Sequence, residues 1–293
     1  YCSGTHIASG GKWLELDSYS DTQSYFEDNP QYTKRAYPFI TDWNEDGNFD
    51  IISGSADGKI YCFLGRGMKT NYEVGPATYF TDENGNALSV GAYSSPVIFD
   101  INGDGKGEIV TGAEDGIIRA YKSLKNEKNP NSMAFSYIGD VINTGLTDSM
   151  ISCGHLNGDN IMDIAVGSRT GEMRVYYGYT DDGKTTKYGD FVPVETNESW
   201  VSPCIHNGKL YSGTLEGYVA TYNLVDGVYK KGEYLEADTN SRRGDKCITL
   251  GMNSVPRFYD IDGDGDDDLI SGSLEYGMAY PIDSENFPYE DEL

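Results

Sequence analysis

Acidic side chains alternate along a short segment near the C-terminus, in a pattern suited to binding a metal ion. The carboxylates of residues 260–268 fall mostly at every second position: Asp260, Asp262, Asp264 and Asp268. Two glycines between them allow the backbone to curl tightly, because glycine tolerates positive φ. Oxygen ligands that converge from such a curl suit Ca²⁺, which takes roughly 6–8 of them. Asp266 would contribute its backbone carbonyl, which makes the segment a candidate calcium loop.

An EF-hand is the first alternative, since its loop begins with the same D-x-D-x-D-G pattern. That loop requires a helix on each side and a glutamate at its twelfth position. The twelfth residue here is Ser271, and residues 269–273 have the composition of a strand. The acidic segment is therefore expected to join two β-strands of a hairpin.

Related segments recur along the chain at regular intervals. In chain order they are loop 1 (residues 42–50), loop 2 (100–108), loop 3 (155–163), loop 4, which is reduced to 207–209, and loop 5 (260–268). Each precedes an apolar block that ends in glycine, and these glycines are spaced by 58, 55, 46 and 59 residues: Gly54, Gly112, Gly167, Gly213 and Gly272. Each unit thus has a strand before the loop, a strand after it, a polar turn and a third strand, and a fourth strand is expected in the variable segment that follows. Four antiparallel strands repeated at this interval are typical of a β-propeller.

The repeat predicts an all-β fold, with one β-propeller domain of four-stranded antiparallel blades over residues 1–293. Repeat units are expected at about 37–93, 94–147, 148–198, 199–252 and 253–293, with a partial blade in 1–36. In that N-terminal piece, residues 7–14 resemble a worn copy of the second and third strands. Six blades are favoured and five are the alternative. The chain ends are expected to join and close the ring, which removes an exposed sheet edge.

The loops and their flanking strands resemble the FG-GAP/VCBS repeats of integrin-α-type propellers and of many secreted bacterial proteins. In that family the pattern D-x-[DN]-x-D-G-x-x-[DE] joins two strands of a blade and holds Ca²⁺. The resemblance covers about residues 37–280. It implies the fold and the cation, but no single activity, because the family includes adhesion receptors, lectins and accessory domains of polysaccharide-degrading enzymes.

The family pattern implies three complete calcium sites, whose ions are expected to be structural. The ligands would be Asp42, Asn44, Asp46 and Asp50 with the Asn48 carbonyl in loop 1; Asp100, Asn102, Asp104 and Glu108 with the Lys106 carbonyl in loop 2; and Asp260, Asp262, Asp264 and Asp268 with the Asp266 carbonyl in loop 5. Loop 3 keeps three ligand positions and loop 4 keeps none: Asn157, Asp159 and Asp163 remain in loop 3. His155 takes the first ligand position there. A hard cation prefers oxygen to imidazole nitrogen, so a fourth ion is left open.

The composition limits the partners. A net charge of −25 and a pI of about 4.3 argue against nucleic acid and anionic membranes. No stretch approaches the roughly 20 apolar residues of a membrane span. Five scattered cysteines without C-x-x-C spacing are expected to be mostly free, buried thiols, with a Cys2–Cys247 bridge as the alternative.

The sequence offers no specific catalytic constellation. It has no G-x-S-x-G, no H-E-x-x-H and no phosphate loop, and its acidic pairs are too abundant to single out a glycosidase acid and base. Aromatic residues in the connecting segments could stack on sugar rings or fill cores. They are Tyr19, Tyr25, Phe26, Tyr32, Tyr72, Tyr79, Phe80, Tyr179, Tyr188 and Trp200.

These features predict a secreted or cell-surface, calcium-stabilised β-propeller that binds a glycan or an extracellular protein without catalysing a reaction. Millimolar calcium outside cells would fill sites of modest affinity, which indicates the extracellular placement. One alternative is a polysaccharide-active enzyme such as a lyase, with calcium and Arg or Lys at one face of the ring. Another is a structural subunit of a surface assembly. A cluster of Arg, Lys or Tyr converging on the axis would favour the enzyme.

Overall fold

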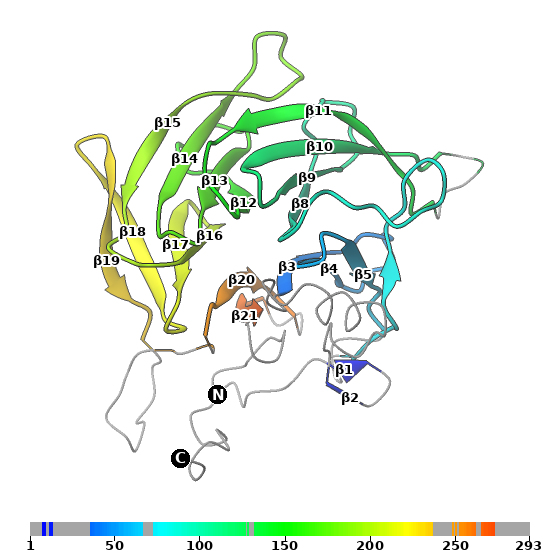
Figure 1. Cartoon of the computed structure of the whole chain (residues 1–293), viewed down its shortest axis with the longest axis horizontal. Helices are drawn as coiled ribbons and strands as arrows, with labels where there is room; N and C mark the ends of the chain where they lie inside the picture. Colours follow the sequence, from blue (N-terminus) through cyan, green and yellow to red (C-terminus); the bar gives the residue numbers. More distant parts are fainter. Residues whose placement is uncertain are drawn as a thin grey trace.

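The structure, a computed structural model, describes residues 8–9, 12–13, 36–66, 73–126, 128, 132–236, 248, 250, 252–261 and 265–272. All regular elements within these ranges are β-strands, so the predicted all-β class is confirmed. No helix within them is long and apolar enough to cross a membrane. The strands form repeated antiparallel sheets arranged around a common centre (Figure 1).

Four repeats form four-stranded sheets, and the described part of the fifth contributes two strands. Unit 1 contains β3 (Ala36–Thr41), β4 (Asp50–Ser55), β5 (Ile60–Phe63) and β7 (Thr78–Tyr79). Unit 2 contains β8 (Ser95–Phe99), β9 (Glu108–Gly112), β10 (Ile117–Ser123) and β11 (Phe135–Asn143). Unit 3 contains β12 (Met150–Gly154), β13 (Asp163–Gly167), β14 (Met173–Tyr179) and β15 (Lys187–Glu195). Unit 4 contains β16 (Val201–His206), β17 (Lys209–Thr214), β18 (Val219–Val225) and β19 (Val228–Tyr234), and unit 5 contains β20 (Val255–Tyr259) and β21 (Asp268–Gly272).

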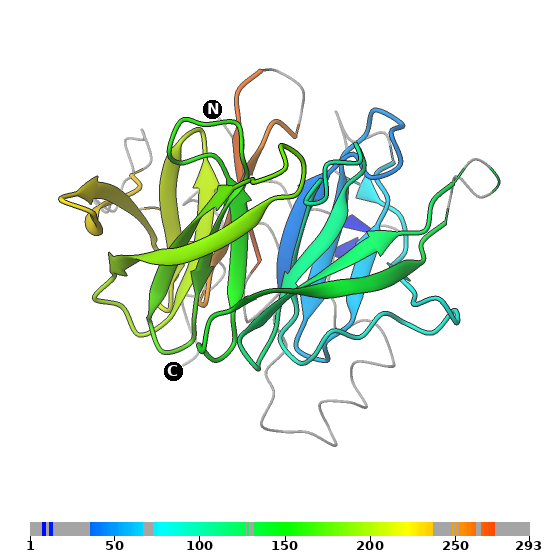
Figure 2. The same cartoon turned by 90° about the horizontal axis from the view of Figure 1, so that it is seen from above.

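Each acidic loop joins the first two strands of its unit, as the sequence predicts. The register pairs Thr41 with Asp50 in unit 1 and Phe99 with Glu108 in unit 2. The last acidic residue of the loop is therefore the first residue of the second strand. Because the units share one topology, their loops emerge on one face of the molecule, where Figure 2 shows loop 1 (blue) and the β20–β21 connection (orange).

The glycine near the end of each second strand lies directly against the first strand of a neighbouring unit. A Cβ atom on these glycines would lie 1.9–2.4 Å from a backbone carbonyl oxygen: Gly54, Gly112, Gly167, Gly213 and Gly272. No side chain fits at such distances, so close approach of two backbones is what requires glycine here. For Gly272 the carbonyl belongs to Ala36, so the last unit contacts the first.

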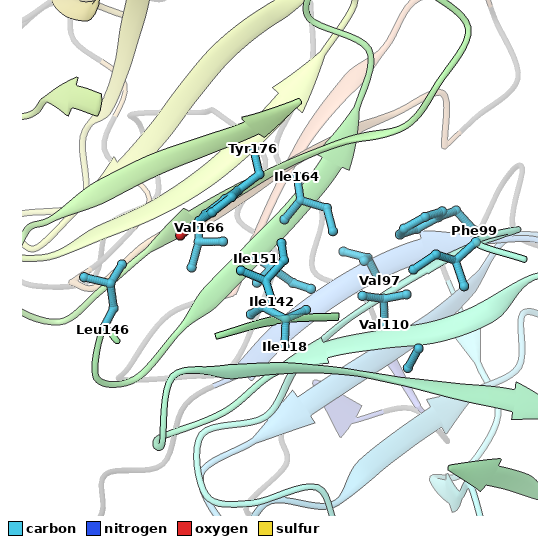
Figure 3. Close-up of a cluster of buried hydrophobic side chains, with 12 residues drawn as sticks. Val97, Phe99, Val110, Ile118, Ile142, Leu146, Ile151, Ile164, Val166 and Tyr176 are labelled. Atoms are coloured by element: carbon cyan, nitrogen blue, oxygen red, sulfur yellow. The ribbon is translucent and has the colours of Figure 1, made fainter. Parts of the chain in front are cut away.

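A hydrophobic core lies between each pair of consecutive units. The one between units 2 and 3 includes Val97, Val110, Ile151 and Ile164 (Figure 3). Equivalent cores join units 1 and 2, units 3 and 4, and units 4 and 5. A further core joins Ile40 of unit 1 to Ile270 of unit 5. The second strands lie between two such cores, which explains why β4, β9 and β13 are buried along their whole length.

The outer strands differ in how their edges are covered. β15 pairs in parallel with β19, which joins units 3 and 4 into one eight-stranded sheet. β1 (Ala8–Ser9) and β2 (Lys12–Trp13) form the hairpin expected in residues 7–14. β1 also pairs in parallel with β6 (Glu73–Val74), which lies in the segment between β5 and β7. The N-terminal hairpin therefore adds to the periphery of unit 1.

Candidate functional site

Loop 1 is stabilised by hydrogen bonds from its backbone N–H groups to its own carboxylates. Oδ1 of Asp42 accepts the N–H of Asp46 at 3.0 Å, and Oδ2 accepts that of Gly47 at 2.9 Å. Asp46 accepts the N–H of Asn48 at 2.8 Å, which lowers its pKa. Asn44 donates its amide to Asp46 at 2.9 Å. The alternating side chains therefore gather on one curl, as the calcium pattern requires.

Loop 2 has the same curl and one unsatisfied carboxylate oxygen. Asp100 accepts the N–H of Gly103 at 2.7 Å and that of Gly105 at 2.7 Å. Oε2 of Glu108 accepts the N–H of Ile101 at 3.2 Å, whereas its Oε1 is buried without a partner. Burial, together with the negative charges of Asp104 and Asp100, raises the pKa of Glu108 to about 7. A group that supplied positive charge at Oε1 would relieve both effects.

The last acidic residue ties loops 1 and 3 to the third strand of their sheets. Asp50 accepts the N–H of Trp43 at 2.7 Å and that of Gly65, after the third strand, at 2.8 Å. Asp163 accepts the N–H of Leu156 at 2.7 Å and that of Gly178 on the third strand at 2.9 Å. Burial raises the pKa of both carboxyls. These residues are thus structural whether or not an ion is bound.

The described part of loop 5 follows loops 1 and 2. Gly265 donates its N–H to Asp260 at 3.1 Å, and Ile261 donates to Asp268 at 3.1 Å. The predicted ligands Asp262 and Asp264 lie outside the described residues. The two ends of the loop therefore have the geometry of loops 1 and 2.

A histidine takes the first ligand position of loop 3, and another ends the strand that leads into loop 4. Nδ1 of His155 lies 3.0 Å from the carbonyl oxygen of Ile161. His206, the last residue of β16, stacks on Phe258 with ring centroids 4.6 Å apart, and its Nε2 lies 3.0 Å from Asp267 of loop 5. Both histidines therefore make contacts within or between loops.

Two lysines approach loops 1 and 2 from unit 2 and were not predicted as part of the site. Nζ of Lys122 pairs with Asp104 at 2.6 Å. Nζ of Lys125 donates to the Trp43 carbonyl at 2.8 Å and lies 3.7 Å from the centroid of the Trp43 ring. Because 82 residues separate Lys125 from Trp43, no local sequence pattern signals that contact.

The loops fit a hard cation in the chemistry of their donors. Within the described ranges, no group of three or more His, Cys, Asp or Glu side chains forms a ready-made metal cluster. The expected ligand sets, however, also include Asn side chains and backbone carbonyls, and many carboxylate oxygens already accept loop N–H groups. The orphaned, buried Oε1 of Glu108 is the observation that best fits an ion, because a carboxylate oxygen is a hard ligand.

Arg257 lies among the first strands, a position that the sequence did not single out. Its side chain is buried, and its guanidinium donates to the carbonyls of Pro203 and Pro256 at 3.1 and 2.8 Å and to that of Ile151 at 3.1 Å. The three carbonyls occupy equivalent positions, because each residue pairs with the one before a closing glycine. The guanidinium thus ties units 3, 4 and 5 together.

The two thiols near Arg257, those of Cys153 and Cys204, are unreactive. Cys62, Cys153 and Cys204 are free, as predicted, while Cys2 and Cys247 lie outside the described residues. Burial raises the pKa of Cys153 to about 12 and that of Cys204 to about 11, against the opposing influence of the Arg257 charge. Both are therefore protonated near neutral pH and are poor nucleophiles.

The aromatic residues divide between core and surface. Phe80 and Trp200 are buried and Tyr179 is exposed, while Tyr79 and Tyr188 are half-buried. Tyr19, Tyr25, Phe26, Tyr32 and Tyr72 lie outside the described residues. On the outer strands, Tyr137 of β11 is 54% exposed and Phe191 of β15 is 44% exposed. These two rings therefore present aromatic surface to solvent.

Together, the repeated sheets and their acidic hairpins define an all-β repeat protein. Residues 42–111 match the family model of the FG-GAP-like repeat. That range contains loops 1 and 2, so the resemblance predicted from the sequence is confirmed over residues 42–111, which are similar to FG-GAP-like repeats.

Solved structures provide further similarities. The BBS1N chain, crystallised in complex with ARL6DN, is 13% identical with a TM-score of 0.45, and the match covers 87% of this chain and 93% of that one. The computationally designed Ika8 protein is 15% identical with a TM-score of 0.35, covering 80% and 55%. The Dos1 propeller is 10% identical with a TM-score of 0.39, covering 79% and 65%. No curated protein matches the chain.

Proposed function

We propose that the chain is a closed, calcium-stabilised β-propeller that acts outside the cell as a non-catalytic module binding a glycan or a protein. The observation that carries the proposal is the buried, unpartnered Oε1 of Glu108 in a loop with two further carboxylates. Burying a carboxylate oxygen without a partner is costly, and a bound cation would supply the missing contact and charge.

Contacts between the last and first units support a ring of five blades rather than six. Gly272 lies against Ala36, and Ile270 shares a core with Ile40. Another buried cluster combines Tyr37 and Val255, from the starts of the first strands in units 1 and 5, with Met150 of unit 3. The β1–β2 hairpin pairs with β6 of unit 1 and does not form a further blade between units 5 and 1. These four observations support closure by direct contact of five units.

Calcium is the ion that the donor chemistry favours. The ligand positions in loops 1, 2 and 5 offer only carboxylate, amide and carbonyl oxygens, which suit a hard divalent cation. Each of these loops would hold one ion, with the residues named above as ligands. The ions would be structural, because the last ligand of loops 1 and 2 begins a strand that is buried along its whole length. Sites of modest affinity fill at extracellular calcium concentrations, which supports secretion or surface display.

The arrangement of polar groups favours binding over catalysis. Arg257 lies where a catalytic cation would be expected, but three of its donors serve backbone carbonyls. Exposed aromatic rings instead lie on the outer strands, and the Arg174 guanidinium covers the Phe191 ring at 4.3 Å. Aromatic and arginine side chains of this kind suit recognition of sugars or proteins. Nucleic acid and membrane insertion remain disfavoured by the charge and hydropathy of the chain.

Ion counting tests the calcium part of the proposal. The wild-type protein, dialysed to equilibrium against millimolar calcium, should retain three ions per chain beyond the calcium of the dialysis buffer, measured by elemental mass spectrometry. Glu108→Gln should retain two, because the amide preserves size but removes the charge at Oε1. Asp190→Asn, an exposed change on β15, is the control and should retain three. A wild type that retains no calcium would refute the proposal.

Ligand screening tests the binding part. A glycan array and a panel of extracellular proteins should show a ligand whose retention falls at least tenfold in the double variant Tyr137→Ala, Phe191→Ala. Retention unchanged by this double variant would place the binding surface elsewhere. Release of unsaturated products from uronate polymers would instead support the lyase alternative.

A further inference from the structure

Loop 3 departs from the other acidic loops at two positions. His155 stands where loops 1, 2 and 5 have their first aspartate. Five residues later those loops have a glycine with φ of 84°, 83° and 97°: Gly47, Gly105 and Gly265. Loop 3 has Asn160 there, and Asn160 does not adopt a positive φ. The glycine turn that donates to the first carboxylate in the other loops is therefore missing as well as the carboxylate itself.

The bonding of loop 3 changes accordingly. In the other loops that glycine donates its N–H to the first aspartate, at 2.9, 2.7 and 3.1 Å. In loop 3 the contact runs from Nδ1 of His155 to the carbonyl of Ile161, at 3.0 Å. A carbonyl only accepts, so Nδ1 carries the proton and donates. Ile161 is the counterpart of Asn48 and Lys106, whose carbonyls the family pattern assigns to the ion.

We propose that loop 3 has exchanged its calcium ion for the His155 side chain. The imidazole N–H occupies the first ligand position and bonds the carbonyl that would otherwise face the ion. Because a carbonyl oxygen directed at an N–H already has its partner, and an N–H repels a cation, the loop is closed without metal. This inference depends on the proposed function for the other loops, since it states which of the repeats takes no ion.

The acidic residues that remain in loop 3 have structural work that needs no ion. Asp163 has both oxygens bonded to backbone N–H groups of Leu156 and Gly178. Oδ1 of Asp159 accepts the N–H of Ile161 at 2.8 Å, and its Oδ2 accepts the side-chain amide of Asn157 at 2.8 Å. The three predicted ligands of loop 3 are thus brought together by the loop itself.

Ion counts in loop 3 variants test the exchange. Asp159→Asn, at an exposed position, should leave the wild-type calcium count unchanged. The double variant His155→Asp, Asn160→Gly restores the first carboxylate and the glycine curl, and should bind one more ion than the wild type. Adding Asp159→Asn to that double variant should remove the extra ion. The matched control Asp46→Asn, at the equivalent position of loop 1, should lose one ion from the wild type.

The outcomes separate this inference from the proposed function. If Asp159→Asn alone lowers the count by one, loop 3 already binds calcium and the exchange is refuted. If the folded double variant gains no ion, His155 and Asn160 are not what excludes calcium, and the inference also fails. If Asp46→Asn and Glu108→Gln change nothing because no ion is bound, the proposed function fails instead. The Asp159→Asn result does not depend on whether the double variant folds.

Discussion

Loops 2 and 3 occupy equivalent places in neighbouring units but close in different ways. Loop 2 gathers three carboxyl groups and leaves Oε1 of Glu108 buried and unpartnered. Loop 3 has lost its first carboxylate and bonds His155 to its own carbonyl. Both keep an acidic residue at the last position, where it accepts the N–H that follows the first ligand position. An acid in that place therefore indicates a closed hairpin, and on our proposal the first position, together with the glycine five residues later, decides whether the hairpin takes an ion.

Removal of calcium should have the largest effect and should distinguish the two loops. If three ions bind as proposed, calcium at 100 times the dissociation constant of each site would stabilise the fold by roughly 8 kcal/mol, at about 2.7 kcal/mol per ion. Chelation should therefore lower the melting temperature by about 15 °C or more, at about 2–4 °C per kcal/mol for a large domain. Hydrogen exchange should report lost protection in residues 100–108 and unchanged protection in 155–163. Equal loss in both loops would contradict the difference drawn between them.

Replacing Arg257 sharpens the comparison, because this guanidinium bonds three backbone carbonyls as His155 bonds one. Arg257→Met keeps the volume but leaves three buried acceptors unsatisfied, at about 1 kcal/mol or more each. We expect a loss of about 3 kcal/mol in chemical denaturation, with and without calcium. Arg119→Met, which breaks a partly exposed pair with Asp115, is the control and should lose less than about 1 kcal/mol. If Arg257→Met lowered the free energy of unfolding only with calcium present, the Arg257 contacts would depend on ions bound in the loops.

Gly272→Ala extends the comparison from loops to the junctions between units. A Cβ at Gly272 would lie 2.4 Å from the Ala36 carbonyl, and one at Gly112 would lie 2.1 Å from that of Ser149. Overpacking of this kind costs about 1–3 kcal/mol, so both substitutions should destabilise by about 2 kcal/mol. Gly189→Ala, whose Cβ would meet only a side-chain atom at 3.8 Å, is the control. A harmless Gly272→Ala beside a damaging Gly112→Ala would argue against ring closure.

The local pattern predicted much of this architecture, whereas contacts between distant segments were beyond it. The spacing of Asp42 to Gly54 and its repeats predicted the hairpins and the all-β class, because alternation and glycine turns act over a few residues. The role of Arg257 was not visible, since its three acceptors lie in different units. Likewise, His155 looked like a defective ligand, because sequence alone does not show that its ring bonds Ile161.

One left-handed backbone position is occupied by a non-glycine residue in loop 1 and by glycine in loop 2. Substitution there should change the stability least of all the variants considered. Glu45 adopts φ of 62°, whereas loop 2 has Gly103 at the equivalent place with φ of 73°. A non-glycine residue in the left-handed region costs about 1–2 kcal/mol, but glycine loses about 0.5–1 kcal/mol more conformational entropy on folding. Glu45→Gly should therefore stabilise the protein by about 0.5 kcal/mol in chemical denaturation. Glu45→Gln removes the same charge and keeps the Cβ atom, so it should leave stability unchanged. An equal gain in both variants would mean that crowding of acidic charge, rather than backbone strain, sets the difference between loops 1 and 2.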